Sequence, residues 1–147
     1  MKLKFTQKGN LEDNQVLNIE QLIENFGYNK KRVVYLENFL ELVLLFKKLG
    51  CKEIYIIGSY ITTKEYPNDI DVCINASDID EKKLIKSELG SIDKYEIARI
   101  KKQKNVHLIL FDNNSREFLD WFKQDREGNK RGIIQLNMKD IEFYDKK

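Results

Sequence analysis

Two early segments place their apolar residues at the spacing of an α-helix. The first is bounded by a capping box of Asn18 and Gln21 and by Gly27, and its apolar positions are Ile19, Leu22, Ile23 and Phe26. The second runs from residue 31 to 49, repeats its apolar positions about every 3.6 residues, and ends at Gly50. The pattern therefore predicts a short first helix and a long second helix that packs against a sheet.

Short runs of β-branched and aromatic residues predict the strands. They lie at residues 54–57, 70–74, 95–100, 106–111 and 132–136. Between them, residues 80–89 predict a helix, and residues 115–124 predict another that Asn114 caps together with Glu117. Because strands and helices alternate, the expected fold class is α/β (α+β), with a mixed central β-sheet and helices packed against it.

The composition is that of a globular protein. Hydrophobic residues make up 41% of the 147 residues, which is enough to close a core, and neither an internal repeat nor a linker divides the chain. Residues 1–147 are therefore expected to form a single domain, with loose ends at 1–10 and 145–147. Cys51 and Cys73 are expected to be buried thiols in a reducing compartment and not a disulfide.

Charge and hydropathy exclude some classes of function. No apolar stretch is long enough for a signal peptide or a membrane span, which predicts a cytoplasmic protein without a membrane partner. The net charge of +2 gives no overall footprint for nucleic-acid binding. Basic clusters at residues 30–32, 99–104 and 130–131 are interpreted as solvated faces. The cluster at 99–104 leaves open a nucleic-acid binder whose affinity would fall steeply with salt.

The candidate chemistry lies between residues 54 and 74. A strand ends at Gly58 and Ser59, a polar loop follows, and the next strand opens with Asp69 and Asp71. Because side chains alternate along a strand, the two carboxylates share one face, where their repulsion favours a bound cation. Mg²⁺ fits, since it takes one or two carboxylates together with water and phosphate oxygens. Gly58 permits a sharp turn and a close approach of the backbone to a nucleotide, and the Ser59 hydroxyl with nearby amides is expected to bind phosphate.

This order of Gly-Ser, polar loop and Asp-x-Asp resembles the motif of the nucleotidyltransferase superfamily, which includes polymerase beta-like enzymes and the minimal nucleotidyltransferases of bacterial toxin-antitoxin systems. The matching residues are Gly58, Ser59, Asp69 and Asp71. A closer resemblance, carried by residues 62–68 and 121–134, is to small, largely uncharacterised bacterial proteins that look like isolated nucleotidyltransferase domains.

The resemblance implies a nucleotidyltransferase fold, with Mg²⁺ as cofactor and a nucleoside triphosphate such as ATP as substrate. It further implies that a nucleoside monophosphate is moved to a hydroxyl group of a protein or tRNA acceptor, in a toxin-antitoxin or phage-defence setting. Asp69 and Asp71 are then the metal ligands and catalytic carboxylates.

One position departs from the superfamily's pattern. A third carboxylate usually lies on a later strand, and this chain has His107 there. Asp112, at the end of the same strand, is an odd number of residues away and is expected to face the other side of the sheet. Three interpretations of His107 remain: the general base, a metal ligand, or a structural histidine hydrogen-bonded within the sheet, which is favoured. The alternative function is therefore a catalytically degenerate module that acts by binding a nucleotide or a partner protein.

The loop at residues 125–131 is a second candidate element. Arg126, Lys130 and Arg131 flank Gly128, so a flexible basic loop is expected to close over a triphosphate. The alternative is a solvated turn in which Asp125 pairs with Arg126.

Further contacts with the nucleotide are expected from residues near the motif. Lys64, in the loop after Gly-Ser, is a candidate phosphate contact. Tyr60 and Tyr66 border the motif and are the aromatic residues best placed to stack on a base, whereas Tyr55 and Trp121 are interpreted as core or rim packing.

Overall fold

The computed structural model describes residues 2–139 and residue 141. Within them, the centre is a five-stranded sheet in the order β1-β5-β2-β3-β4. Its strands are β1 (Gln15–Leu17), β2 (Ile54–Ile57), β3 (Ile70–Asn75), β4 (Val106–Phe111) and β5 (Ile134–Leu136). The outer pairs, β1 with β5 and β3 with β4, are parallel, whereas β2 runs antiparallel to both β3 and β5. The sheet is therefore mixed.

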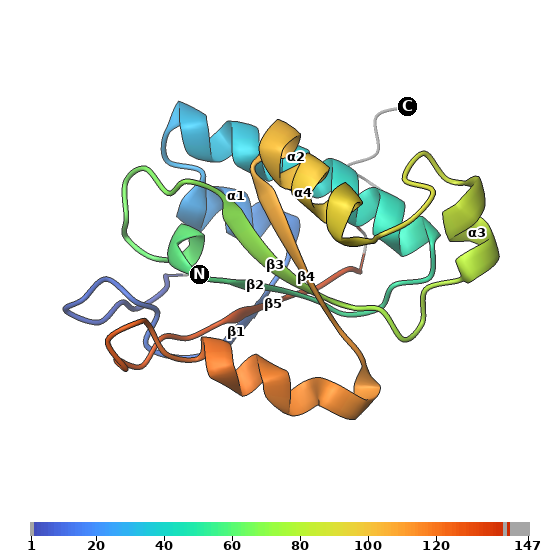
Figure 1. Cartoon of the computed structure of the whole chain (residues 1–147). Coiled ribbons are helices and arrows are strands. Elements are labelled where there is room, and N and C mark those ends of the chain that lie inside the picture. The colour runs from blue at the N-terminus through green and yellow to red at the C-terminus, as the bar shows by residue number, and fades with distance from the viewer. Residues whose placement is uncertain (1, 140, 142–147) are drawn as a thin grey trace.

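Helices cover one face of this sheet, and a 3₁₀ segment lies on the other (Figure 1). The covering helices are α1 (Ile19–Phe26), α2 (Lys30–Lys48) and α4 (Lys94–Lys104), and the short α3 (Glu81–Lys86) lies to one side. The opposite face carries η2 (Asn113–Phe122), the orange segment below the sheet. The expected class, a mixed sheet with helices packed against it, is confirmed.

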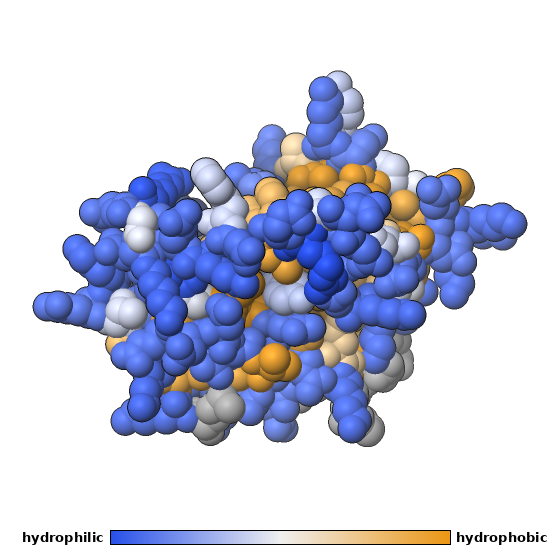
Figure 2. Space-filling model, turned by 90° about the horizontal axis from the view of Figure 1, so that it is seen from below, coloured by the Kyte–Doolittle hydropathy of each residue, from blue (hydrophilic) through white to orange (hydrophobic). Residues whose placement is uncertain are grey.

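Successive side chains along a strand belong to two separate hydrophobic cores, because they point to opposite faces of the sheet. Ile56 and Val72 belong to the core beneath the helices. Tyr55 and Cys73 belong to a smaller core beneath η2. Seen from the η2 side, apolar surface is visible between hydrophilic side chains (Figure 2). This second face, on which residue 71 also lies by alternation, is therefore only partly covered.

The first two predicted helices are confirmed. The Asn18 side chain accepts a hydrogen bond from the Gln21 N–H at 2.8 Å, and the Gln21 side chain accepts one from the Asn18 N–H at 2.9 Å, which is the expected capping box. The second helix begins at Lys30, after Asn29 as its N-cap. The strands predicted at 54–57 and 106–111 have those bounds.

The strand predicted at residues 95–100 is wrong, because these residues belong to α4. The Asp93 carboxylate caps the helix by accepting a hydrogen bond from the Glu96 N–H at 2.9 Å, and Asn105 ends it in the left-handed conformation at φ 59°. Ile100 is fully buried and Ile97 packs against the same core. Their separation of three positions is a helical spacing and not that of a strand.

The later elements are shorter or tighter than predicted. The segment expected as a helix at 115–124 is the 3₁₀ segment η2, and its N-cap is Asp112, whose Oδ1 accepts a hydrogen bond from the Asn114 N–H at 2.9 Å. The predicted cap at Asn114 is therefore wrong. The helix predicted at 80–89 is limited to α3, and the strand predicted at 132–136 is limited to β5.

Residues 3–10 are held in the fold, contrary to the expectation of a loose end at residues 1–10, of which Met1 lies outside the described residues. Leu3 is 8% exposed and Asn10 is 1% exposed, and a β-bridge joins Phe5 to Leu11. The adjoining β1 was missed because three residues are too short for a recognisable period. The tail at 145–147 lies outside the described residues.

Cys51 and Cys73 are free and buried, as expected. Burial raises the pKa of the Cys51 thiol to about 11 and that of the Cys73 thiol to about 12, so both are unreactive thiols at neutral pH. In the described part of the chain, no helix has the length and apolar character needed to cross a membrane.

Candidate active site

The turn after β2 brings the backbone against a carboxylate of the neighbouring strand. Gly58 has φ 77° and ψ −160°, a conformation that is essentially restricted to glycine. A Cβ at this position would lie 2.5 Å from Asp71 Oδ2, which is closer than real contacts allow. Ser59 follows as the first residue of the short 3₁₀ helix η1 (Ser59–Ile61) and is half-buried. Gly58 is therefore required by both the turn and the position of the Asp71 side chain.

The structure brings Asp69 and Asp71 together at the start of β3. Asp71 pairs with Ile57 of β2 on one side and with His107 of β4 on the other. Burial raises the pKa of Asp71 above its ordinary value, the Asp69 carboxylate raises it further, and His107 opposes both effects. Two carboxylates thus share a partly buried position in which the negative charge of Asp71 is disfavoured.

The raised pKa of Asp71 leads to a stability prediction. The folded state holds the Asp71 proton more tightly than the unfolded state, so the free energy of unfolding falls as pH rises from about 3.9, the ordinary aspartate pKa, through the raised value. Asp71→Asn is expected to raise the free energy of unfolding by about 1 kcal/mol at pH 7 in metal-free buffer, a gain typical of relieving one unfavourable contact. Urea unfolding at pH 7 and pH 3 measures it.

At pH 3 the gain from Asp71→Asn should vanish, because aspartic acid and asparagine are then both neutral. Asp78→Asn, at an exposed position beyond the other end of β3, is the matched control and should show no such pH-dependent gain. A loss of stability in Asp71→Asn at pH 7 would contradict the unfavourable charge inferred here.

His107 contacts the carboxylate pair directly. Its Nδ1 lies 3.2 Å from Asp71 Oδ1, across the parallel pairing of β3 and β4. Its side chain is 35% exposed. The hydrogen bond is the one expected of a structural histidine. In the tautomer with Nδ1–H donating to Asp71, Nε2 is also left as a proton acceptor, so the geometry accommodates a general base as well.

A cation from α4 approaches the other carboxylate. Lys101 Nζ lies 3.9 Å from Asp69 Oδ2, and its side chain is 50% exposed. At least this member of the basic cluster at 99–104 thus lies beside the carboxylates. The sequence shows the basic cluster at 99–104, but it does not indicate which of its residues faces the site.

Arg32 organises the loop between the Gly-Ser turn and the Asp-x-Asp. It is fully buried, although the cluster at 30–32 was interpreted as a solvated face, and that interpretation is wrong for this residue. Its guanidinium donates hydrogen bonds to five backbone carbonyls, those of Phe26, Tyr60, Thr62, Lys64 and Glu65. It also lies over the rings of Tyr28 and Tyr60, 4.4 and 4.6 Å from their centroids.

The same contacts settle the positions of two loop residues. Lys64 is bound through its backbone carbonyl, which also accepts a hydrogen bond from the Tyr28 hydroxyl at 3.1 Å, and the residue is exposed. Tyr60 is fully buried and its hydroxyl donates to the Arg32 carbonyl at 2.7 Å. The expectation that Tyr60 stacks on a base is therefore wrong. Tyr66 is 56% exposed.

The buried Asn10 links the N-terminal segment to the basic loop. Its Nδ2 donates to Asp125 Oδ2 at 3.0 Å, and its Oδ1 accepts from Arg131 Nε at 2.9 Å. Hydrogen bonds from Asn10 and Asn129 lower the pKa of Asp125 to about 2. The partners of Asp125 are thus amides and not Arg126, which corrects the alternative pairing. Sequence reasoning missed Asn10 because its partners lie more than a hundred positions away.

A cleft of about 520 Å³ opens beside this loop. Its lining residues are Trp121, Phe122, Gln124, Asp125, Arg126, Gly128 and Arg131. Burial lowers the pKa of Arg131, while the carboxylates of Asp125 and Asp71 raise it, so the guanidinium senses the charge of Asp71. Arg131 lies just before β5, at the end of the sheet where the neighbouring β2 runs into the Gly58 turn, so the cleft is at the same end of the sheet as the carboxylate pair. Lys130 lies apart from it, with Nζ 3.4 Å from Asp13 Oδ1.

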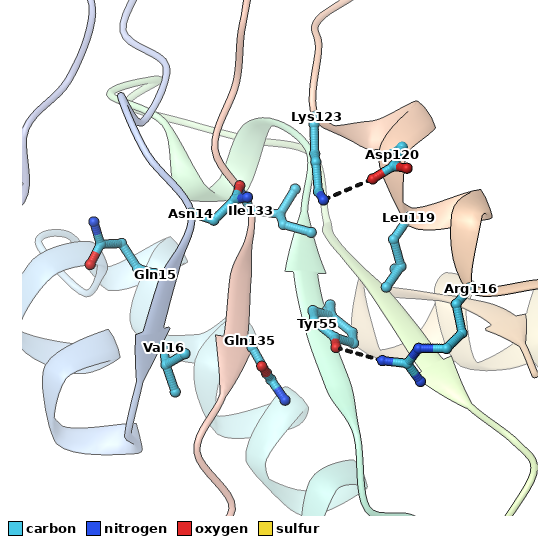
Figure 3. A pocket seen from close by; sticks show the side chains of 10 residues that line it. All are labelled: Asn14, Gln15, Val16, Tyr55, Arg116, Leu119, Asp120, Lys123, Ile133 and Gln135. Carbon is cyan, nitrogen blue, oxygen red and sulfur yellow. Dashed lines mark hydrogen bonds and ion pairs between the residues drawn. The ribbon is translucent and has the colours of Figure 1, made fainter. Parts of the chain in front are cut away.

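A second groove, of about 360 Å³, lies between the sheet and η2 (Figure 3). Its charged side chains are already paired. Arg116 bonds the Glu53 carboxylate at 2.8 and 2.7 Å and reaches Tyr55, and Lys123 lies 2.8 Å from Asp120. None of the residues expected from the sequence to form the site lines this groove.

The side chains at this site can hold Mg²⁺ only through two carboxylates, those of Asp69 and Asp71. Among the described residues, no group of three or more His, Cys, Asp and Glu side chains is arranged to hold a metal ion. Mg²⁺ needs only one or two protein carboxylates when phosphate oxygens and water complete its octahedron, and Asp69 with Asp71 offers that number. These two residues are the ones that fit the ion.

The fold and the site define a small mixed α/β domain with a pair of carboxylates at the open face of its sheet, beside a glycine turn. Among known families, the chain belongs to the family described as "Family of unknown function (DUF6932)", which it matches over residues 3–137. No curated protein and no solved structure matches the chain.

Proposed function

We propose that this protein is a Mg²⁺-dependent nucleotidyltransferase that moves a nucleoside monophosphate from a nucleoside triphosphate to a hydroxyl group. The observation that carries the proposal is the pair of carboxylates, Asp69 and Asp71, gathered beside the Gly58 turn, where burial and mutual repulsion disfavour the charge of Asp71. A divalent cation relieves that repulsion. A protein or RNA acceptor, in a toxin-antitoxin or phage-defence setting, follows from the resemblance of the motif and is part of the proposal.

The residues around the pair have separate roles in this reaction. Bound Mg²⁺ supplies charge neutralisation at the transferred phosphoryl group. Ser59 holds phosphate oxygens through its hydroxyl, and Lys64 and Arg126 are exposed cations available to the same triphosphate.

The proton transfer is assigned to His107, which Asp71 orients through the 3.2 Å contact at Nδ1. The acceptor oxygen forms a bond to the α-phosphorus, the bond from that phosphorus to the bridging oxygen breaks, and pyrophosphate leaves. The proton of the attacking hydroxyl passes to His107 Nε2.

Thermal unfolding with each nucleoside triphosphate, with and without Mg²⁺, tests the proposal. One nucleotide is expected to raise the midpoint by roughly 8 °C at a hundred times its dissociation constant, which corresponds to about 2.7 kcal/mol. The Mg²⁺-dependent part should disappear in Asp69→Asn and persist in Asp78→Asn, the exposed control. The second measurement is the transfer of label from the α-phosphate of that nucleoside triphosphate to an acceptor that co-purifies with the protein. The absence of any shift with all nucleotides would contradict the proposal.

A second candidate is a degenerate domain that binds a nucleotide or a partner protein without transfer. The observation that favours it is His107, which occupies the place of a third carboxylate and is hydrogen-bonded to Asp71. The two functions differ in one measurement. If the protein is a binder, Asp69→Asn keeps both the nucleotide-induced rise in the unfolding midpoint and the effect of the protein when it is expressed in cells. If it is a transferase, Asp69→Asn loses the Mg²⁺-dependent rise and that effect.

A further inference from the structure

Trp121, the single tryptophan of the chain, is 71% exposed. Of the core or rim packing expected for it, this exposure excludes a place in the core. The segment that carries it is anchored by other side chains: Leu119 is 7% exposed, and Phe122 packs against the core beneath η2. The indole is thus presented to solvent at the wall of the 520 Å³ cleft by a segment that does not need it for packing.

The cleft combines this aromatic surface with guanidinium groups. In the described part of the chain, the exposed Arg126 has no hydrogen-bond or ion-pair partner. Within the described residues, the Arg131 guanidinium is bound only through Nε, to Asn10, and its two Nη groups are left for another acceptor. The Asp125 carboxylate is occupied by Asn10 and Asn129 and does not neutralise Arg126. The lining therefore suits a ligand that has both an aromatic ring and an anionic group.

We propose that this cleft is the nucleotide pocket of the protein, in which Trp121 stacks on the base while Arg126 and Arg131 hold phosphate oxygens. The inference rests on the proposed function and adds to it the residue that binds the base. The volume of about 520 Å³ is in the usual range for small-molecule pockets. Arg131 precedes β5 at the end of the sheet where the antiparallel β2 runs into the Gly58 turn beside Asp71, so the cleft and the carboxylate pair lie at the same end of the sheet.

The fluorescence of Trp121 reports on the pocket directly, because no other tryptophan contributes. In EDTA, at least one nucleoside triphosphate is expected to quench it saturably, whereas inorganic tripolyphosphate should compete for the site without quenching. Trp121→Ala should weaken binding of that nucleotide about tenfold by calorimetry, the size expected for loss of one stacked base. Arg126→Gln should weaken both the nucleotide and tripolyphosphate. Trp121→Phe should retain most of the nucleotide affinity.

Two controls separate the pocket from the proposed chemistry. Tyr95→Ala removes an equally exposed aromatic ring, 74% exposed on α4 across the sheet, and should leave affinity unchanged. Asp69→Asn should abolish transfer and leave the quenching in EDTA intact. Quenching in the unsubstituted protein, together with no transfer by it in the presence of Mg²⁺, would overturn the proposed function and support the pocket. Transfer with an unchanged KM in Trp121→Ala, or no quenching by any nucleotide, would overturn the pocket.

Discussion

Replacing Arg32 by methionine is expected to lower the free energy of unfolding by at least about 3 kcal/mol, which corresponds to a fall of roughly 10 °C in Tm. Methionine fills much of the space but donates no hydrogen bond. The carbonyls of Phe26, Tyr60 and Thr62 would each lose a donor inside the protein, and a buried acceptor left without a partner costs about 1–3 kcal/mol.

Arg32→Lys is expected to be intermediate and not conservative. An ammonium group carries three donors at one point, whereas the planar guanidinium spreads its donors over carbonyls from two segments, at residue 26 and at residues 60–65. Amide hydrogen exchange should show the loop at 62–65 opening more often in both variants, because its backbone is held to the core by this side chain.

Arg99→Met is the matched control for Arg32→Met. Arg99 lies on the surface of α4, 43% exposed, where it pairs with Glu96 and Gln103. Its replacement should leave the unfolding midpoint unchanged. Equal midpoints for Arg32→Met and Arg99→Met would contradict the role assigned to Arg32.

Gly58→Ala is expected to reduce the proposed nucleotide transfer about 100-fold and to destabilise the fold by about 2 kcal/mol. A Cβ at this position would lie 2.5 Å from Asp71 Oδ2, so either the turn or the carboxylate must move. The strain of a non-glycine residue at φ 77° and ψ −160° is added to that clash. Steady-state kinetics and urea unfolding measure the two effects.

Comparison with Gly90→Ala separates the effect of the clash from the effect of backbone strain. Gly90 also has a positive φ, of 70°, but a Cβ there meets nothing within 4 Å, so only the backbone strain remains. In the double variant Gly58→Ala with Asp71→Ala, the clashing carboxylate is absent, and the destabilisation should be smaller than the sum of the single effects. Full activity in Gly58→Ala would show that the position of Asp71 against the turn is not needed.

Both predictions concern residues that hold the carboxylates and are not proposed to touch a substrate. Arg32 fixes the loop that leads to Asp69, and Gly58 makes room for Asp71. A site assembled from loop backbone and strand ends depends on such contacts, because its side chains must be held within a fraction of an ångström for chemistry.

The sequence by itself determined the elements that depend on local contacts. The capping box at Asn18 and the long apolar period of α2 act over a few residues, and the spacing of two positions at the start of β3 brings Asp69 and Asp71 together. The prediction failed for residues 95–100, where a short apolar run fits both a strand and a helix. Capping by Asp93 and burial of Ile100 decide for the helix.

The tertiary structure alone decided which polar residues support the carboxylate pair and its surroundings. Arg32 reaches carbonyls some thirty positions away, and Asn10 binds partners 115 and 121 positions away in sequence. It also decided that Trp121 is exposed beside Arg126, where the sequence indicated packing. Periodicity reports which face of an element is buried, but it carries no information on what that face meets. Hydrogen bonds and clefts form between segments that only the folded chain brings together.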